Sequence, residues 1–263
     1  MKVVASTANP SYKALLKLAQ SSRERKKRAL SLLDGIHLIA AYRDHVGVPR
    51  QVAVSRSGLE QPEVRDLLAT LRPLDPLVLT DVLFGALSTV DTPTGVLAAV
   101  TTPRPPGIPS EIESCVMLED IQDPGNLGSI LRSAAAAGVR RVYLSKNSVQ
   151  TWSPRVLRAA MGAHFMLQIH EQCDLLAFAR GFRGRIVATS QCARKTVFDV
   201  DLTGRVALVF GNEGAGLSPA LVQEAHEVVS IPMPGEVESL NVAAAAAVCL
   251  FERVRQLQLK CTQ

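Results

Sequence analysis

The chain has 263 residues, of which 47% are hydrophobic and 20% charged, a composition typical of a folded globular protein with one large or two medium domains. So much apolar material excludes a mainly disordered chain, and the lack of any run of about eighteen uncharged apolar residues excludes a membrane protein. The net charge of +5 is concentrated in residues 1–28, which hold eight Lys and Arg residues against one acidic residue, whereas residues 111–263 hold fifteen of each sign. This asymmetry indicates a polyanionic partner at the amino-terminal end, although a basic solvated helix face explains it equally well.

The first hundred residues are predicted to form a small α/β module. Its expected elements are helices at 10–19, 34–45 and 60–71, and strands at 51–54, 77–79 and 95–100. Residues 101–114 hold four prolines and one glycine, which is typical of a stiff interdomain linker. We therefore expect one domain at 1–100, a linker at 101–113 and a second domain at 114–263.

The second domain shows a cleaner alternation of elements. Its expected strands lie at 115–118, 141–144, 165–169, 185–189, 206–210 and 228–231, and its helices at 127–137, 153–161, 174–179, 219–224 and 240–257. Alternating helices and apolar strands predict an α/β fold with a mostly parallel sheet covered on both faces.

Several familiar site signatures are missing from the sequence. It contains no G-x-S-x-G, no H-E-x-x-H, no P-loop, and no G-x-G-x-x-G after the first strand. The five histidines lack metal-ligand spacing, so we expect no metal. The five cysteines form no C-x-x-C pair, and no apolar stretch of a secretory signal follows Lys2. We therefore expect reduced thiols in a cytoplasmic protein.

Three polar or glycine-rich loops each follow a predicted strand, where open α/β sheets bind ligands. The first, EDIQDPGNLGSILR at 119–132, brings Asn126 to the start of a helix and Arg132 about one and a half turns inside it. A helix N-terminus with a glycine on either side of Asn126 suits an anionic or polar ligand. An ordinary Asx-type cap with a surface arginine is an equally good interpretation of this loop alone.

The other two loops are as ambiguous when each is taken alone. VFGNEGAGLS at 209–218 has three glycines in six residues and Glu213 as its only charge, so it could bind a ligand or simply turn the chain. SIPMPGEVESLNVA at 230–243 has two prolines, and its Ser239 and Asn241 stand at the start of an apolar helix. A capping serine before a core helix explains much of that third pattern.

Together, and in this order, the three loops resemble the motifs of the SpoU (TrmH-like) RNA ribose methyltransferases of the SPOUT superfamily. The resemblance covers residues 114–263, including SPRVLRAAMGA at 153–163, and departs from the family where Asp123 and Gly125 open the first motif. The amino-terminal region is similar to the family's auxiliary substrate-binding domain, with Asp34 where glutamate is usual.

The resemblance implies transfer of a methyl group from S-adenosylmethionine to an RNA ribose 2′-hydroxyl, by a trefoil-knotted α/β domain that works as a homodimer. Arg132 would be the catalytic residue, either as the base or as an electrostatic stabiliser. The second role is open because a free guanidinium keeps its proton up to pH values of about 12. The residues that would position Arg132 and the ribose are Asn126, Glu213, Ser239 and Asn241. Those that would hold the methyl donor are Thr189, Gly211, Asn212, Ile231, Pro232, Met233 and Leu240.

The basic amino-terminal segment would then dock RNA through its phosphates. Its candidate residues are Lys13, Lys17, Arg23, Arg25, Lys26, Lys27 and Arg28. The auxiliary domain favours ribosomal RNA over tRNA, and deletion of residues 1–28 is expected to flatten the salt dependence of RNA binding. The alternatives are a tRNA 2′-O-methyltransferase, a base methyltransferase of the knotted superfamily, and a non-catalytic RNA-binding protein. A nucleotide-dependent oxidoreductase is disfavoured by the missing glycine fingerprint.

Overall fold

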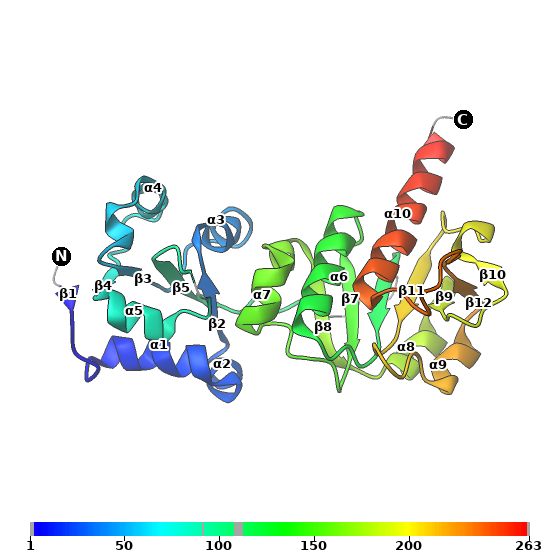
Figure 1. Cartoon of the computed structure of the whole chain (residues 1–263), viewed down its shortest axis with the longest axis horizontal. Helices are drawn as coiled ribbons and strands as arrows, with labels where there is room; N and C mark the ends of the chain where they lie inside the picture. Colours follow the sequence, from blue (N-terminus) through cyan, green and yellow to red (C-terminus); the bar gives the residue numbers. More distant parts are fainter. Residues whose placement is uncertain (1–2, 91, 108–112, 262–263) are drawn as a thin grey trace. The chain divides into compact units, whose positions relative to one another are not determined.

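The computed structural model describes residues 3–90, 92–107 and 113–261, and its contacts divide the chain into two compact units (Figure 1). Unit 1 consists of Met1–Pro103 with Trp152–Phe165, and unit 2 of Arg104–Thr151 with Met166–Gln263. Within the described residues, no helix is both long enough and apolar enough to cross a membrane.

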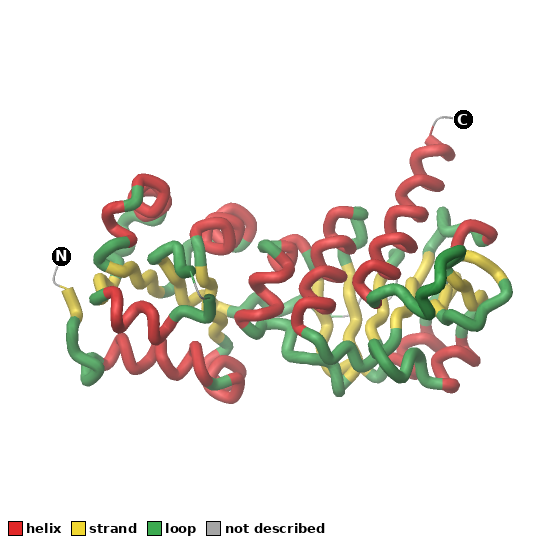
Figure 2. The backbone as a smooth tube through the Cα atoms, in the orientation of Figure 1, coloured by secondary structure: helices red, strands yellow, loops and turns green. Residues whose placement is uncertain are grey.

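Unit 1 is built on a mixed five-stranded sheet (Figure 2). Its strands lie in the order β1 (Val3–Val4), β4 (Leu77–Leu79), β3 (Gln51–Ser55), β5 (Val96–Thr101) and β2 (Leu30–Asp34). Strand β5 runs antiparallel to both of its neighbours, whereas β1, β4 and β3 are parallel to one another.

Helices cover both faces of this sheet because side chains alternate along each strand. Leu32 packs into one cluster with α1 (Pro10–Gln20) and α5 (Asp81–Leu87), while Leu33 packs into the other with α3 (Ile36–His45) and α4 (Pro62–Thr70). Beside α1 lies α2 (Ser22–Arg28), which ends at Ala29 in the left-handed region with a φ of 51°. The short 3-10 helix η1 (Gly58–Glu60) precedes α4.

The segment Trp152–Phe165, with α7 (Pro154–Ala160), packs into the core of unit 1 although the expected domain division assigns it to the second domain. Trp152 is 7% exposed and Leu157 fully buried, both in the cluster that holds Leu33. Phe165 meets Tyr42 edge-on with ring centroids 5.4 Å apart. Helical periodicity predicts that α7 exists but not which sheet its apolar face covers.

Unit 2 contains a seven-stranded sheet in which every pairing is parallel, so the prediction of an α/β fold with a mostly parallel sheet is confirmed. The strand order is β10 (Lys195–Thr196), β12 (Glu227–Ser230), β9 (Arg185–Thr189), β11 (Val206–Phe210), β6 (Cys115–Leu118), β7 (Arg141–Ser145) and β8 (Gln168–Cys173). The central strand β11 is buried along its whole length.

Helices lie on both faces of this second sheet. On one face, α8 (Leu175–Gly181) and α9 (Pro219–Glu224) cover a cluster that includes Tyr143. On the other, α6 (Pro124–Ala136) packs beside α10 (Val242–Cys261), as Figure 1 shows. Two 3-10 helices, η2 (Ala163–Met166) and η3 (Val197–Asp199), follow α7 and β10. Because the strands are parallel, all their carboxyl ends meet at one edge of the sheet.

Candidate active site

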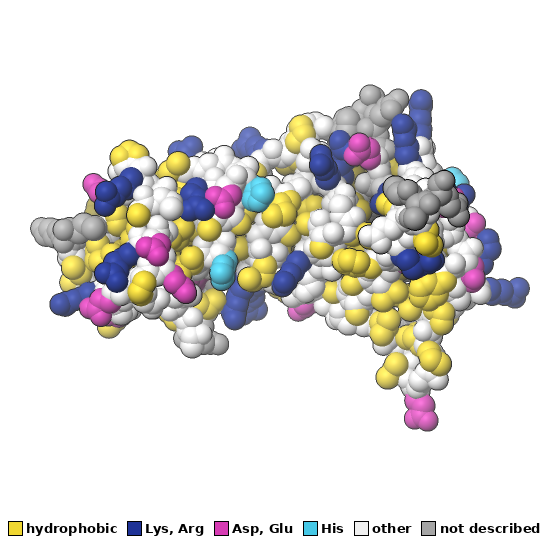
Figure 3. Space-filling view, turned by 90° about the horizontal axis from the view of Figure 1, so that it is seen from above, with side chains coloured by type: hydrophobic (Ala, Val, Ile, Leu, Met, Phe, Trp, Pro, Cys, Tyr) yellow, Lys and Arg dark blue, Asp and Glu magenta, His cyan; other side chains and the backbone are white. Residues whose placement is uncertain are grey.

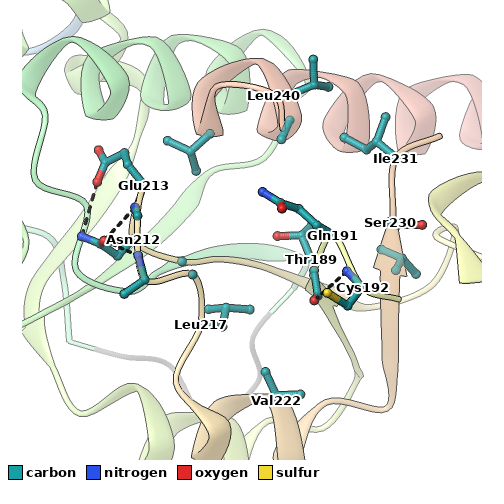
Figure 4. Close-up of a pocket in the computed structure, with 18 of the residues that line it drawn as sticks. Thr189, Gln191, Cys192, Asn212, Glu213, Leu217, Val222, Ser230, Ile231 and Leu240 are labelled. Carbon is teal, nitrogen blue, oxygen red and sulfur yellow. Dashed lines mark hydrogen bonds between the residues drawn. The ribbon is translucent and has the colours of Figure 1, made fainter. Parts of the chain in front are cut away.

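A cavity of about 330 Å³ lies at the carboxyl ends of β9, β11 and β12. Its size falls within the range of small-molecule sites in proteins. Figure 4 shows Ile231 and Leu240 on one side and Leu217 and Val222 on the other, with Thr189 and Gln191 between them. The remaining lining residues are Ser190, Cys192, Gly211, Asn212, Glu213, Gly214, Ala215, Gly216, Val229, Ser230, Met233, Val242 and Ala245.

The loop after β11 folds tightly on itself, which explains its glycines. A Cβ added to Gly211 would lie 2.3 Å from the carbonyl carbon of Gly216, and Gly216 itself has a φ of +69°. The backbones of Asn212 and Gly216 exchange two hydrogen bonds, of 3.0 and 2.9 Å. The Asn212 side-chain oxygen accepts from two more backbone N–H groups, while its Nδ2 donates to the Asp120 carbonyl at 2.8 Å. Asn212 therefore holds the loop in shape and ties it to the end of β6.

Glu213 joins this loop to the start of α6. Its Oε1 accepts from the Asn126 Nδ2 at 3.0 Å and from the Asp123 N–H at 3.1 Å, and its Oε2 accepts from the Gln122 N–H at 3.2 Å. Partial burial alone would raise the pKa of the Glu213 carboxyl, but these hydrogen bonds outweigh burial and lower the pKa. A carboxylate at a helix N-terminus is also favoured by the helix dipole.

Asn126 connects the first loop to the third. Its Oδ1 accepts from the Nδ2 of Asn241 at 2.7 Å, so the two ends of its amide are committed to Asn241 and Glu213. Asn241 in turn accepts from the Ala243 N–H at 2.9 Å, which explains why α10 begins at Val242 and not at the predicted residue 240. One hydrogen-bonded chain thus unites residues that are 87 and 115 positions apart.

Three predicted site residues lie outside both the cavity lining and this hydrogen-bonded chain. Pro232 stands between two lining residues, and Ser239 is exposed just before Leu240. Arg132 is exposed on α6, and no hydrogen bond or ion pair joins its side chain to any described residue. In a single chain, Glu213 is the only charged side chain among the described residues that line the cavity.

The sequence reasoning missed part of the cavity wall. Gln191 and Cys192 directly follow β9, so the rule that ligands bind beyond strand ends could have found them. Leu217 belongs to the glycine-rich loop at 209–218 but was not named as a site residue, and Val222 of α9 lies outside every motif. The Thr189 hydroxyl donates to the Val209 carbonyl at 3.1 Å, so a ligand would have to compete for this group.

Most of the predicted phosphate-binding residues are exposed. These are Lys13 and Lys17 on α1, and Arg23, Lys26, Lys27 and Arg28 on α2. Arg28 forms an ion pair with Glu24 at 3.2 Å.

Arg25 corrects the prediction, because its side chain is only 7% exposed. Its Nη1 donates to the carbonyls of Leu18 at 2.7 Å and Ala19 at 3.3 Å, and burial lowers the pKa of its guanidinium. Arg25 therefore fastens α2 to the end of α1 and does not present its charge to a phosphate. A basic run in sequence does not reveal which of its members points inward.

Comparison with known proteins places this site in context. Residues 113–251 match the model of the SpoU rRNA Methylase family. The chain is 35% identical over 260 residues to an uncharacterized tRNA/rRNA methyltransferase of Synechocystis sp., an alignment that covers 96% of this chain and 93% of the relative. It is 27% identical to the 23S rRNA (guanosine(2553)-2′-O)-methyltransferase RlmP of Bacillus subtilis, with 95% of this chain and 98% of that protein covered.

The whole chain also resembles a solved structure. The SpoU methyltransferase AviRb from Streptomyces viridochromogenes, in complex with the cofactor AdoMet, superposes with a TM-score of 0.82 at 28% identity, covering 96% of this chain and all of that one. The three motif loops, two of which line the cavity while the first is hydrogen-bonded to them, lie within the segment that matches the family model. The chain belongs to the SpoU rRNA methylase family.

Proposed function

We propose that the protein transfers a methyl group from S-adenosylmethionine to a ribose 2′-hydroxyl of RNA, with ribosomal RNA as the substrate. The observation that carries this proposal is the hydrogen-bonded chain Asn241–Asn126–Glu213, which joins three motif loops beside a cavity of ligand size. RlmP is named as a 23S rRNA 2′-O-methyltransferase and AviRb is described with bound AdoMet, which supports both the reaction and the donor.

The cavity fits such a donor in size and in chemistry. Apolar side chains such as Ile231, Leu240 and Leu217 suit an adenine ring, and the polar Ser190, Gln191 and Asn212 suit hydroxyl and amino acid groups. At Gly211, where a Cβ would meet the opposing backbone, the loop can remain this tight only without a side chain. When bound, S-adenosylmethionine supplies an activated methyl group on a positively charged sulfur.

The protein's own residues then align the acceptor and help it lose its proton. Asn126 is held rigidly by its two partners, so it presents a fixed polar surface at the start of α6. We assign Arg132, on the same helix, to the reacting hydroxyl. A guanidinium that is exposed and unpaired among the described residues is free to contact an RNA phosphate or the forming alkoxide.

The family resemblance also supports a trefoil-knotted arrangement of unit 2 and a homodimer, in a cytoplasmic protein. Several large apolar side chains on and before α10 are exposed, among them Phe251 at 48% and Leu259 at 55%. Figure 3 shows hydrophobic side chains gathered on the visible face of unit 2. Such a surface suits burial against a second copy of the chain.

Unit 1 would dock the RNA through α1 and α2, with Arg25 excluded from the contact surface. Deletion of residues 1–28 is no longer a clean test, because Tyr12, Leu15 and Leu18 of α1 are buried in the core. Substitution of the exposed lysines replaces it.

The proposed function is tested by incubating the full chain with S-adenosylmethionine labelled in its methyl group and with rRNA from a strain that lacks the protein. We expect label in the rRNA and a new 2′-O-methylated nucleotide, detected as a bond that resists alkaline hydrolysis. Label in tRNA alone would redirect the proposal to tRNA. Donor binding without transfer to any RNA would indicate a non-catalytic RNA-binding protein.

A further inference from the structure

A second cavity, of about 280 Å³, lies at the edge of the unit 2 sheet opposite the donor cavity. Its wall includes Ser114, Arg140 and Arg205, which directly precede β6, β7 and β11. Because these strands are parallel, the three residues stand at amino ends, whereas the donor cavity occupies carboxyl ends. The remaining lining residues are Glu113, Gly138, Val139, Gly204 and Arg253.

Arg253 of α10 is the most constrained charge in this cavity. Its Nη2 donates to the Ser114 hydroxyl at 2.8 Å. That hydroxyl also accepts from the Val206 N–H and donates to the Gly204 carbonyl, both at 3.1 Å, so the serine is held by the segment that leads into β11. The Nε of Arg253 is buried and finds no hydrogen-bond acceptor among the described residues. Burial also lowers the pKa of its guanidinium.

Other arginines of unit 2 have carboxylate partners that Arg253 lacks within the described part of the chain. Arg255 pairs with Glu252 at 2.7 Å, and Arg180 with Glu224 at 2.9 Å. A partly buried charge held only by a neutral hydroxyl is costly, and a nearby anion offsets that cost. The planar guanidinium fork is the side chain best shaped for two oxygens of a phosphate.

The charges of the described residues that line this cavity are also unbalanced. Glu113 is the only acidic residue among the described lining residues, and its carboxylate is engaged with Arg141 at 3.5 Å. Arginines continue along the amino edge at Arg140, Arg141, Arg185 and Arg205, beside the carboxylates of Glu113 and Asp201. The carboxylate of Glu227, the first residue of β12 at the same edge, is paired with Lys195 at 2.8 Å. At the amino ends of β7, β9 and β11, the described arginines therefore outnumber the described carboxylates.

We propose that this arginine cavity binds a phosphodiester group of the RNA backbone and so gives unit 2 a phosphate contact of its own. That the phosphate belongs to RNA rests on the proposed function. A polymer is favoured over a small free anion because the arginines extend along the strand ends beyond the cavity, where successive strands lie about 4.8 Å apart. The contact would add affinity and register without reading sequence.

The test uses the full chain and a fluorescein-labelled 20-nucleotide poly(U) RNA, with affinity measured by anisotropy over a series of KCl concentrations and no methyl donor present. The variants are Arg140→Ala, Arg205→Ala and the double variant. The matched control is Arg180→Ala, which removes one exposed charge of α8 that is not among the cavity lining residues. Arg253→Lys keeps the positive charge but removes the planar guanidinium, so it tests whether the guanidinium of the partly buried Arg253 contributes to RNA affinity.

We expect Arg140→Ala and Arg205→Ala each to reduce the magnitude of the slope of log K against log salt by about 0.7, the value for one single-strand phosphate contact, and the Arg180→Ala control to leave the slope unchanged. Donor affinity and melting temperature should stay at the wild-type values. An unchanged slope in the double variant, or an equal fall in the control, overturns the proposal. Calorimetric binding of inorganic pyrophosphate together with an unchanged slope would assign the cavity to a small anion and overturn it as well.

This experiment separates the inference from the proposed function, because RNA affinity is measured without catalysis. A protein that transfers no methyl group but shows the expected slopes would refute the proposed function and leave the phosphate site standing. In an active enzyme, the double variant should raise the KM for RNA and leave kcat unchanged.

Discussion

At Gly211 a single hydrogen atom in place of a side chain permits the tight loop that borders the donor cavity. Gly211→Ala would place a methyl group 2.3 to 2.4 Å from backbone atoms of Gly216 and Leu217, so the loop itself has to move. We expect a loss of S-adenosylmethionine affinity of about 5- to 150-fold, measured by calorimetry, since overpacking of this kind costs about 1–3 kcal/mol. Gly181→Ala is the control, because its Cβ meets nothing within 4 Å. Equal affinities of the two variants would contradict the prediction.

Arg132→Ala should separate chemistry from donor binding. Because Arg132 is exposed and outside the cavity lining, we expect unchanged donor affinity and a fall in methyl transfer of about a hundredfold or more. Single-turnover kinetics with saturating RNA measure the chemical step. Arg132→Lys keeps a positive charge, and partial activity with an unaltered pH profile would indicate electrostatic stabilisation and not proton transfer. Full activity of Arg132→Ala would remove it from the proposed mechanism.

The lowered pKa of Glu213 predicts how the stability of the folded protein depends on pH. Because its folded pKa lies below the unfolded value of 4.5, its stabilising contribution is complete above that value and is lost as the pH falls through the folded pKa. We expect Glu213→Gln to lower the melting temperature at neutral pH, with the difference from wild type shrinking below about pH 4.5. Glu63→Gln is the control, because the Glu63 side chain is exposed on α4. A difference that stays constant down to pH 3 would contradict the assignment.

For single residues, the sequence predicted which residues belong to the site better than it predicted the directions and contacts of their side chains. The loops that hold Asn126, Glu213 and Asn241 could be selected because each follows a strand and carries polar or glycine-rich segments. Their hydrogen bonds could not be foreseen, because contacts across 87 and 115 positions depend on the strand order. Arg25 was predicted to bind phosphate, but its side chain is buried, and the sequence of a basic segment does not indicate which of its side chains are buried.

Among the elements, α1 and α2 carry the proposed RNA surface. We expect the combined substitution of Lys13, Lys17, Lys26 and Lys27 by alanine to lower the salt slope of RNA binding by about 0.7 for every RNA phosphate that these lysines neutralise in the wild type. All four side chains are exposed, so the melting temperature should change little. The control changes Arg43, Arg56, Arg65 and Arg72, four basic residues elsewhere in unit 1, to alanine. Matching slopes in the two variants would show that the cluster is an ordinary solvated face.

Elements with strong local signals were predicted closely, and those that depend on context were not. Strands β4, β6, β9 and β11 have the predicted bounds because each is a short apolar run between turn residues. Helix α5 was missed, since Gly85 weakens a seven-residue pattern. The strand predicted at 165–169 begins instead at Gln168, because residues 163–166 form a 3-10 helix.

For the molecule as a whole, the decisive element is the segment Trp152–Phe165. Its Trp152 fills one of the two clusters of unit 1, so we expect Trp152→Ala to destabilise unit 1 by about 3–5 kcal/mol in urea unfolding, and Trp152→Phe by less. Residues 1–103 expressed alone should be unstable until a peptide of residues 150–167 is added. A cooperative transition of full stability for 1–103 alone would contradict this.

The same segment constrains the order in which the protein can be made. Translation delivers residues 1–103 first, and domains usually fold as they emerge. In this protein one apolar face of the unit 1 sheet is covered in part by Trp152 and Leu157. These two residues are synthesised only after α6 and β7 of unit 2. The amino-terminal unit is therefore completed only after part of the methyltransferase half has been synthesised. A chain that ends before residue 150 would leave this apolar face of unit 1 exposed.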